Sequence, residues 1–454
     1  MNLKRKPFSA FLIAGTNSGS GKTTLSLGIL RAFSRRGLVP APFKCGPDYI
    51  DPLFHRQAAG RISVNCDPFL MGPGGVRRSF SRHVSDSCVA VVEGVMGLFD
   101  GNSPGTLAGS SAEIAALLDI PVVLVVNARG MAGSIAPLVR GFSQWEPRVR
   151  IVGVIADNIG SAHHAELLRS ALASAGLPPL LGALARDERL RLPERHLGLA
   201  PAQLEESWLD MHAEAVETSI DLDRLLALTR VVPPSAEPVP AVVPPPSVVR
   251  LGVARDEAFQ FYYAENFELL RQFGVETVPF SPLRDAALPE NLAGLWFGGG
   301  FPELYVETLS RNHSMLEAIR AFAASGRPVY GECGGYLYLL EALTDFDGVR
   351  RPLLGLLPGE AVMGQKLASL GYRELTSCSE SLFGPAGTKL RGHEFHYSFL
   401  KNGPSGGNLF ASRDLRGVER PAGSVCGNLC GSYIHLHFAS NPAAAEALVR
   451  RLQA

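Results

Sequence analysis

The stretch that decides the fold of the N-terminal half reads Gly15-Thr16-Asn17-Ser18-Gly19-Ser20-Gly21-Lys22-Thr23-Thr24. A strand-like apolar run (11–14) precedes it, and a helical run (24–30) follows it. Glycines let successive backbone N–H groups turn inward on phosphate oxygens, while the helix N-terminus and Lys22 add positive charge. The Thr23 hydroxyl suits a magnesium ion. The stretch therefore predicts a loop, Gly15–Thr24, that binds a nucleoside triphosphate with Mg²⁺.

Further strand-like runs lie at 89–92, 122–126 and 151–155. They are continuously apolar, which is typical of parallel strands buried on both faces. A second series of strands begins at 248–254, after a stretch rich in proline. We therefore predict an α/β protein with two doubly wound domains. The predicted parts are a P-loop NTPase-like domain (1–230), a Pro-rich linker (231–247) and a second α/β domain (248–454).

Composition excludes several classes of partner. The 454 residues carry no net charge, so nothing suggests binding to nucleic acid or anionic lipid. No apolar run approaches the ~20 residues of a membrane span. Seven cysteines are scattered along the chain, which favours a reduced cytoplasmic protein over a disulfide framework.

Two segments could bring carboxylates to the phosphates. Asp48 follows one probable strand, and Glu93 and Asp100 follow another. Ligands of open α/β sheets lie beyond the carboxyl ends of the strands, so these three acids are expected to converge. One or two carboxylates, with phosphates and water, usually hold magnesium. The less favoured alternative is structural, in which Asp48, Asp51, Glu93 and Asp100 cap helices or brace glycine turns.

A second reaction centre is predicted in the C-terminal half, at Gly331-Glu332-Cys333-Gly334-Gly335. A cysteine between a strand and a helix in a Gly-x-Cys-x-Gly frame is typical of a nucleophile on a sharp turn. The following helix N-terminus should lower the thiol pKa. The amides of Gly334 and of the turn that contains Gly299 and Gly300 are natural oxyanion-hole donors. The alternative is a buried structural cysteine.

The base must come from elsewhere in the chain. A strand-like segment, 432–438, carries His435 and His437, and His435 is the candidate. A zinc site is the competing interpretation, because cysteine and histidine are common zinc ligands and Cys426 and Cys430 lie shortly before the two histidines. On a strand, the two histidines would share one face. A triphosphatase joined to a thiol hydrolase indicates glutamine-dependent amide synthesis, with one half activating an acid and the other releasing ammonia.

Five segments together resemble the cobyrinic acid a,c-diamide synthases. They are 15–24, 44–51, 92–101, 392–398 and 432–442, and the resemblance covers nearly the whole chain. The phosphate loop, in which Thr16 replaces the usual first glycine, is one residue longer than the strict pattern, as in dethiobiotin synthetase. The resemblance implies a dethiobiotin-synthetase-type domain and a class I glutamine amidotransferase domain of flavodoxin-like fold. It implies ATP-dependent amidation of the a and c acetate groups of a cobalt corrinoid through acyl phosphates.

The resemblance also implies roles for residues. Cys333 is the glutaminase nucleophile and His435 its base. Lys22, Thr23, Asp48 and Glu93 serve ATP and Mg²⁺, the last three as metal ligands. The positions expected near the substrate carboxylate are Lys44, Tyr49, Ile50 and Asp100. The expected partners are small molecules (glutamine, ATP and a corrinoid or related tetrapyrrole), and a homodimer is compatible with the family.

Two departures bear on mechanism. Most amidotransferases of this fold carry glutamate two residues after the histidine, whereas this chain has His437, as is usual for the cobyrinate branch. His435 therefore lacks an obvious orienting carboxylate, and we expect slow glutamine hydrolysis without the partner substrate. Relatives generally have Asn where Asp157 stands, at a position expected to read the nucleotide base. A carboxylate only accepts hydrogen bonds, which leaves ATP and GTP open.

Three rival functions remain. Sister amidases on the same scaffold act on hydrogenobyrinate, sirohaem or nickel-sirohydrochlorin, and they differ only in the ring pocket. A partner-regulated P-loop ATPase usually begins its loop with a second lysine, where this chain has Thr16-Asn17. A stand-alone glutaminase subunit would leave the N-terminal half unexplained.

Overall fold

The computed structural model describes residues 8–84, 87, 89–103, 105–190, 192, 204–232, 248–401 and 407–454. The chain divides into two compact units, Met1–Pro68 with Gly72–Val239, and Phe69–Met71 with Pro240–Ala454. The predicted linker, 231–247, lies outside the described residues from 233 onward. Among the described residues, no helix has the length and apolar character needed to cross a membrane.

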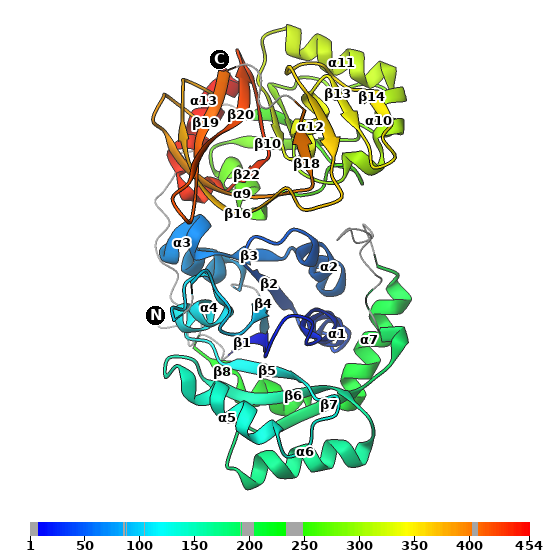
Figure 1. The fold of residues 1–454 in the computed structure, drawn as a ribbon, viewed down its shortest axis with the longest axis vertical. Coiled ribbons are helices and arrows are strands. Elements are labelled where there is room, and N and C mark those ends of the chain that lie inside the picture. The colour runs from blue at the N-terminus through cyan, green and yellow to red at the C-terminus, as the bar shows by residue number, and fades with distance from the viewer. Residues whose placement is uncertain are drawn as a thin grey trace. The chain divides into compact units, whose positions relative to one another are not determined.

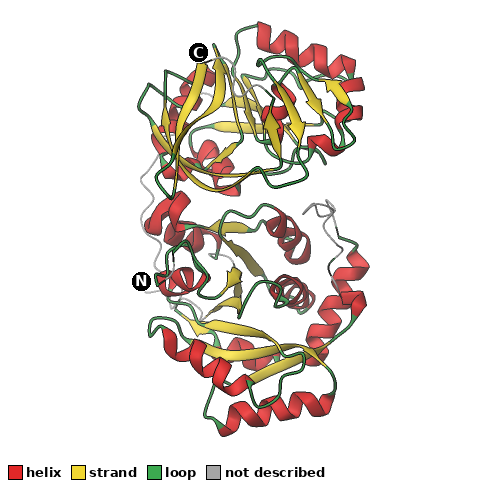
Figure 2. Ribbon diagram, in the orientation of Figure 1, coloured by secondary structure: helices red, strands yellow, loops and turns green. Residues whose placement is uncertain are grey.

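The first unit is a parallel sheet in the order β3-β2-β4-β1-β5-β6-β7, with the short β8 antiparallel to β1. Figures 1 and 2 show α1, α2 and α7 together beside this sheet. Its strands are β1 Phe8–Gly15, β2 Pro40–Cys45, β3 Val64–Cys66, β4 Val89–Gly97, β5 Val122–Asn127, β6 Ile151–Ile159, β7 Leu180–Ala185 and β8 Arg230–Val231. Its helices are α1 Lys22–Arg35, α2 Ile50–Ala59, α3 Pro68–His83, α4 Ser111–Leu118, α5 Ile135–Trp145, α6 Ala162–Ser174, α7 Glu206–Ser219, α8 Leu222–Leu228 and the 3₁₀ turn η1 Glu188–Leu190.

Apolar residues explain why this sheet is the centre of the unit. Every residue of β1 is buried, and β5 is buried from Val122 to Val126. One core joins Phe11 and Val91 of the strands to Leu27 of α1 and Leu209 of α7. Burial on both faces is what continuous apolar strands predict, and the predicted runs at 11–14, 89–92, 122–126 and 151–155 all form strands.

The second unit has a ten-stranded sheet in the order β10-β9-β11-β12-β21-β20-β19-β16-β17-β22 and a four-stranded sheet in the order β14-β13-β15-β18. Its strands are β9 Val249–Ala254, β10 Val275–Phe280, β11 Gly294–Phe297, β12 Val329–Glu332, β13 Ala342–Thr344, β14 Arg350–Pro352, β15 Glu360–Met363, β16 Ser369–Ser377, β17 Lys389–His396, β18 Ser398–Leu400, β19 Gly407–Asp414, β20 Glu419–Cys426, β21 Leu429–Ser432 and β22 Ile434–Leu436. Its helices are α9 Ala264–Gln272, α10 Val306–Arg311, α11 His313–Ala324, α12 Gly334–Leu339, α13 Pro442–Gln453 and the 3₁₀ turns η2 Pro302–Leu304 and η3 Phe438–Ser440.

The large sheet of the second unit is mixed. The pairs from β10 to β21 are parallel, as the sequence predicts, whereas the pairs from β21 through β20, β19, β16 and β17 to β22 are antiparallel. The antiparallel part folds β17 and β22 back, and this brings a histidine-bearing strand toward the cysteine turn after β12. The sequence predicts the parallel half but not this extension.

Candidate active sites

Sheet order in the first unit brings three predicted segments to one edge. β4 lies between β2 and β1, so the segments that follow these strands are neighbours. Within the sheet, Glu93 pairs in register with Lys44 on one side and with Ile13 on the other. The carboxyl ends of parallel strands form the ligand crevice in such folds. The approach of Lys44 to Glu93 beside the phosphate loop is therefore built into the topology.

The phosphate loop joins β1 to α1. Gly21 caps α1 with a φ of 88°, which glycine adopts without strain. Lys22 is buried (8% exposed), and its Nζ donates to the Asn17 carbonyl at 3.2 Å across the loop. Burial and the positive charge of Lys44 lower the pKa of Lys22. The negative charge of a bound phosphate would stabilise the charged form of Lys22 and so offset both effects on its pKa. The loop is therefore suited to binding an anion.

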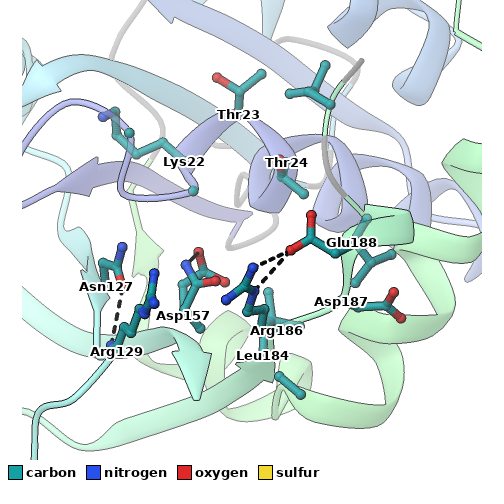
Figure 3. Close-up of a pocket in the computed structure, with 16 residues that line it drawn as sticks. Lys22, Thr23, Thr24, Asn127, Arg129, Asp157, Leu184, Arg186, Asp187 and Glu188 are labelled. Atoms are coloured by element: carbon teal, nitrogen blue, oxygen red, sulfur yellow. Dashed lines mark hydrogen bonds and ion pairs between the residues drawn. The ribbon is translucent and has the colours of Figure 1, made fainter. Parts of the chain in front are cut away.

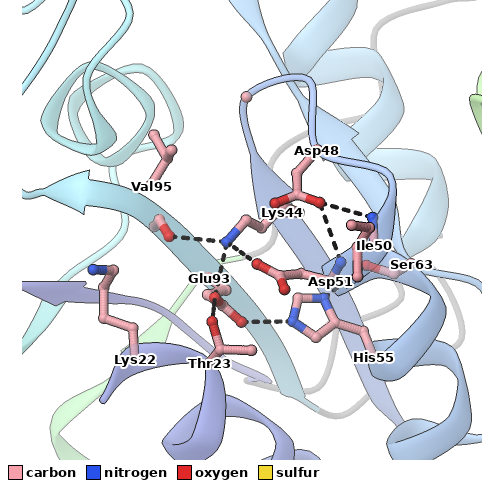
Figure 4. Close-up of polar contacts among 12 residues, drawn as sticks. Lys22, Thr23, Lys44, Asp48, Ile50, Asp51, His55, Ser63, Glu93 and Val95 are labelled. Atoms are coloured by element: carbon pink, nitrogen blue, oxygen red, sulfur yellow. Dashed lines mark hydrogen bonds and ion pairs between the residues drawn. The ribbon is translucent and has the colours of Figure 1, made fainter. Parts of the chain in front are cut away.

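Glu93 is the hub of a buried polar cluster beside the loop (Figure 4). Its Oε1 accepts from Thr23 Oγ1 at 2.6 Å and from Lys44 Nζ at 2.8 Å. Its Oε2 lies 2.7 Å from His55 Nε2, and His55 Nδ1 lies 3.1 Å from Ser63 Oγ. Burial would raise the pKa of Glu93, but Lys44 and His55 outweigh it and lower that pKa. Glu93 is therefore an ionised carboxylate.

Lys44 joins a second carboxylate to this hub. Its Nζ lies 2.7 Å from Asp51 Oδ2 and donates to the Gly94 carbonyl at 3.2 Å. Burial opposes the charge of Lys44, yet Asp51 and Glu93 more than offset it and raise the pKa of Lys44. Removing one partner would leave a buried charge uncompensated, which is strongly destabilising.

Two members of the cluster were not predicted from the sequence. His55 was not named there, and Asp51 was considered only as a possible helix cap. Both lie on α2, four residues apart, and so on one face of that helix. The signal was the Asp-x-x-x-His spacing directly after the predicted 44–51 segment. That spacing is common, and it becomes informative only because α2 packs against β2, the strand next to β4.

The residues beside the loop fit a magnesium ion. Thr23 Oγ1 and Glu93 Oε1 are hard oxygen donors already in contact, which suits Mg²⁺ together with phosphates and water. Asp48 is half-buried, and its Oδ1 accepts from the amides of Ile50 and Asp51 at 2.7 and 3.2 Å, so this oxygen holds the start of α2. Its role as a ligand stays a prediction.

The predicted substrate positions differ in setting. Asp100 is exposed, and its Oδ2 accepts from the Gly97 amide at 2.8 Å, which braces the turn after β4. Tyr49 and Ile50 are half-buried at the start of α2. Lys44, in contrast, is buried in the carboxylate cluster. Proximity to a substrate carboxylate stays a prediction for all four.

A pocket of about 580 Å³ extends from the phosphate loop (Figure 3). Lys22, Thr23 and Thr24 line one part of it, and Asp157 and Arg186 line another. A Cβ built on Gly21 would lie 2.5 Å from Asp157 Oδ2, so this carboxylate approaches the loop itself. Burial raises the pKa of Asp157. The pocket gives a nucleotide bound at the loop room to reach Asp157.

Asn127, Arg129 and Arg186 also line this pocket and were not predicted from the sequence. Asn127 is the register partner of Asp157 at the ends of β5 and β6. Arg186 follows β7 directly. The available signal was that all three lie at or just after carboxyl ends of parallel strands.

In the second unit, Cys333 occupies the predicted sharp turn between β12 and α12. Its φ of 47° is rare for a residue with a side chain and indicates a strained elbow. The Cys333 amide donates to the Ser432 carbonyl at 2.8 Å, which ties the turn to the neighbouring β21. The thiol Sγ lies 3.7 Å from the Phe395 carbonyl of β17.

The predicted oxyanion-hole glycines lie beside this elbow. A Cβ on Gly334 would approach the Gly300 nitrogen to 3.1 Å, so these two backbones are adjacent. Gly300 has a φ of 153°, and a Cβ there would meet the Ala258 carbonyl. The Gly299 amide differs from the prediction, because it donates to the Phe261 carbonyl at 3.3 Å in an isolated antiparallel bridge. The proposed donors therefore narrow to Gly300 and Gly334.

His435 is buried on β22 and lies against the same glycine turn. A Cβ on Gly299 would lie 2.2 Å from His435 Cε1. In the sheet, His435 pairs with His393 of β17, the strand whose Phe395 carbonyl contacts the thiol. The glycine turn and β17 thus both border Cys333 and His435, although the two residues are about 100 positions apart in the chain.

The thiol pKa differs from the sequence expectation. Burial raises the pKa of Cys333, with Glu303 adding to it, and the Gly334 amide only partly offsets this. Burial also lowers the pKa of His435 to about 3. These shifts favour a neutral thiol and a neutral imidazole, because the six-residue α12 cannot outweigh desolvation.

His437 does not share a strand with His435, contrary to the prediction. β22 ends at Leu436, and His437 caps η3. His437 is buried against the Tyr263 ring (centroids 4.8 Å apart), and neither of its nitrogens has a hydrogen-bond partner among the described residues. In the part of the chain that is described, no group of three or more His, Cys, Asp or Glu side chains is placed to hold a metal, which leaves the zinc reading without support.

His437 makes stability pH-dependent. Burial lowers its pKa from 6.5 to about 3, so the unfolded chain binds the proton more tightly. The stabilisation is full above pH 6.5 and is lost as pH falls toward 3, at roughly 1.4 kcal/mol per pH unit. We compare the free energy of unfolding, measured with urea on the whole protein, at pH 7 and pH 5. We expect it to fall less between these pH values in the variant His437→Phe, which keeps a ring against Tyr263, than in the unchanged protein. Equal losses in both proteins would contradict this.

The two sites define a class of protein, a P-loop nucleotide-binding domain joined in one chain to a glutamine amidotransferase domain with a cysteine nucleophile elbow. Family models agree. Residues 11–199 match the CobQ/CobB/MinD/ParA nucleotide binding domain, and residues 250–443 match the CobB/CobQ-like glutamine amidotransferase domain. The protein is thus an enzyme, a glutamine-dependent ligase.

Curated relatives narrow the class. A cobyrinate a,c-diamide synthase of Syntrophotalea carbinolica is 45% identical over 96% of this chain and 97% of its own. Those of Dehalococcoides mccartyi (41% identical, 98% of each chain) and Priestia megaterium (39% identical, 98% of this chain and 97% of its own) are similar over the same extent. The chain belongs to the cobyrinate a,c-diamide synthase family.

Proposed function

We propose that this enzyme amidates the a and c acetate carboxylates of cobyrinate, with glutamine as the nitrogen donor and ATP as the activating substrate. The observation that carries the proposal is similarity to synthases of that name over nearly the full length of both chains. The phosphate-loop pocket and the Cys333 elbow supply the two half-reactions that such a synthesis needs.

In the first unit, a substrate carboxylate oxygen attacks the γ-phosphorus of ATP, and ADP leaves. Backbone amides of the loop and Lys22 Nζ hold the phosphates and offset the charge that develops on them. Thr23 and Glu93, with Asp48 nearby, would hold Mg²⁺, which would draw charge from the phosphate oxygens. Lys44 and His55 fix the Glu93 carboxylate through hydrogen bonds. Ammonia then attacks the acyl phosphate, and phosphate leaves as the amide forms.

In the second unit, Cys333 Sγ attacks the carboxamide carbon of glutamine while the thiol proton passes to His435. The amides of Gly300 and Gly334 stabilise the resulting oxyanion. His435 then protonates the leaving nitrogen, ammonia is released, and water hydrolyses the thioester to glutamate. The neutral resting pair supports the expectation that glutamine hydrolysis is slow until substrates are bound.

Asp157 is proposed to read the nucleotide base. A carboxylate accepts from the N6 amine of adenine, and it also accepts from N1 and N2 of guanine. Asn158 Nδ2 donates to Asp157 Oδ2 at 2.9 Å, which leaves Oδ1 as the oxygen for the base. We propose ATP as the substrate of this family member, with GTP as the direct comparison.

The ring substrate is tested by turnover of purified tetrapyrroles with glutamine and either ATP or GTP, read by product mass. We expect cobyrinate to gain two amide groups, each replacing a hydroxyl by an amine and lowering the mass by about one dalton. Each amide should require one ATP. Faster turnover of hydrogenobyrinate, sirohaem or nickel-sirohydrochlorin would reassign the enzyme to a sister amidase. Unchanged mass for every ring would overturn the proposal.

A further inference from the structure

Glu332, the residue directly before the nucleophile, lies beside the candidate base. Its Oε2 is 4.0 Å from His435 Nδ1, and the two side chains are only 2% and 3% exposed. The position that carries glutamate in most amidotransferases of this fold is His437, which is neutral and faces Tyr263. We propose that Glu332 positions His435, and so supplies the orienting carboxylate from β12 instead of from the segment after the histidine.

The carboxylate of Glu332 is firmly held. Its Oε1 accepts from the Tyr330 hydroxyl at 2.7 Å and from the Leu436 amide at 3.0 Å. Leu436 follows His435 on β22, so the strand that carries the imidazole also fixes the carboxylate. With Oε1 committed to these donors, Oε2 is the oxygen that faces the imidazole. An orienting group must itself be immobilised in this way.

The orientation of the His435 ring agrees with this role. Its Cε1 edge abuts Gly299, where a Cβ would lie 2.2 Å from Cε1 and 3.1 Å from each ring nitrogen. Nδ1 is the nitrogen near Glu332. Nε2 is the other ring nitrogen, and the proposed mechanism assigns the thiol proton to it. At 4.0 Å the contact is longer than a hydrogen bond, so an ionised Glu332 acts through its charge and favours the tautomer with the hydrogen on Nδ1, in which Nε2 can take the thiol proton.

Protonation of Glu332 would remove this preference. A protonated carboxyl carries no charge, so it no longer favours the hydrogen on Nδ1, and an imidazole with its hydrogen on Nε2 cannot act as the base. Burial raises the pKa of Glu332 to about 8, with Tyr330 and the Leu436 amide partly opposing this. Glutamine hydrolysis should therefore rise with pH through the Glu332 pKa, since the ionised form is the active one.

One other carboxyl near the thiol titrates in a similar range, because burial raises the pKa of Glu303 to about 7, so the pH profile belongs to Glu332 only if Glu332→Gln loses it. Facing Glu332, burial raises the pKa values of Tyr330, Tyr262 and Cys333, so these groups are neutral there. Around His435 lie His393, His396 and Glu394. Glu394 Oε1 lies 2.9 Å from His396 Nε2 and its Oε2 lies 2.7 Å from Arg373 Nε, and its pKa is lowered to about 2. Glu394 is thus a fixed negative charge beside these histidines.

The test is the variant Glu332→Gln. Its amide oxygen can accept the same two hydrogen bonds as Oε1, so β12 stays anchored, but the side chain no longer presents a negative charge to Nδ1. We expect kcat with glutamine to fall on the order of 100-fold with little change in KM. The rise of the rate with pH should disappear, and the rate with added ammonium salt should be unchanged. Glu341→Gln, which changes an exposed carboxylate of the same unit, is the matched control.

A second readout follows the thiol directly. Labelling of Cys333 by a diazoketone analogue of glutamine, measured by peptide mass, should slow in Glu332→Gln and lose its pH dependence. A glutamine rate within threefold of the unchanged enzyme with the same pH profile would overturn the inference. An equal loss of the ammonium-dependent rate would also overturn it, because the effect would then not act through His435.

The proposed role of Glu332 rests on the proposed roles of Cys333 and His435. Different outcomes overturn the glutaminase assignment and the role of Glu332. Glutamine use that survives Cys333→Ala overturns the glutaminase assignment itself. Normal glutamine use in Glu332→Gln, with Cys333→Ala inactive, overturns only the role of Glu332.

Discussion

Cys333→Ala is expected to lower glutamine-dependent amidation by at least about 1,000-fold and to leave the ammonium-dependent rate within twofold. The thiol is the only proposed atom that forms a covalent bond to glutamine, and removal of a nucleophile usually costs this much or more. Ammonia enters after that step, so acyl-phosphate formation at Lys22 and Glu93 should be intact. Product mass with glutamine or with ammonium chloride, each with ATP, measures both rates.

The matched control is Cys430→Ala, which removes another buried thiol from the same unit, on β21. It should change neither rate by more than about twofold, although it removes apolar contacts from the core. Glutamine-dependent turnover that persists in Cys333→Ala would refute the assignment of the second unit. Loss of both rates in that variant would show that the elbow supports the synthetase half as well, contrary to the mechanism.

Lys22→Ala is expected to lower both the glutamine-dependent and the ammonium-dependent rates on the order of 100-fold or more. Its ammonium group is the one cation that the structure places inside the phosphate loop, as far as the described residues go, and electrostatic stabilisation of transferring phosphate is usually the largest single contribution. Lys22 is buried with a lowered pKa, so binding of a triphosphate should also weaken. Initial rates and ATP binding by calorimetry measure the two effects.

The integrity of the second unit serves as the control for this variant. Labelling of Cys333 by the glutamine analogue should proceed in Lys22→Ala at the rate of the unchanged enzyme, because the thiol site contains no residue of the loop. Arg35→Ala, at the last turn of α1, changes a cation of the same helix outside the loop and should keep both rates. An ammonium-dependent rate that survives in Lys22→Ala would contradict activation at this loop.

Several features could be predicted from sequence because they depend on local pattern. The loop from Gly15 to Thr24 lies between a strand and a helix, and Cys333 lies between two glycines on an elbow, as the spacing indicates. The helix cap by Asp48 and the turn braced by Asp100 were the structural alternatives for those residues, and both contacts are present. Each of these features involves residues within about ten positions of one another.

Other features depend on distant segments and were missed or mistaken. His55 reaches Glu93, and Asp51 reaches Lys44, only because α2 packs against β2, the strand next to β4. The thiol pKa was expected to be low, yet desolvation by the surrounding core raises it. Gly299 was expected to donate to an oxyanion, but the bridge to Phe261 uses its amide.

The sequence by itself determined the two kinds of chemistry, because a phosphate loop and a nucleophile elbow are short motifs whose backbone geometry is encoded by neighbouring glycines. Only the tertiary structure decided which residues serve each centre. The antiparallel return of β17 and β22 brings His435 to the glycine turn beside the elbow and within 4.0 Å of Glu332. The parallel order of β2, β4 and β1 places Lys44, Glu93 and the loop together. Strand order determines which side chains are in contact, and burial shifts their pKa values. Both depend on pairings between strands that are far apart in the chain.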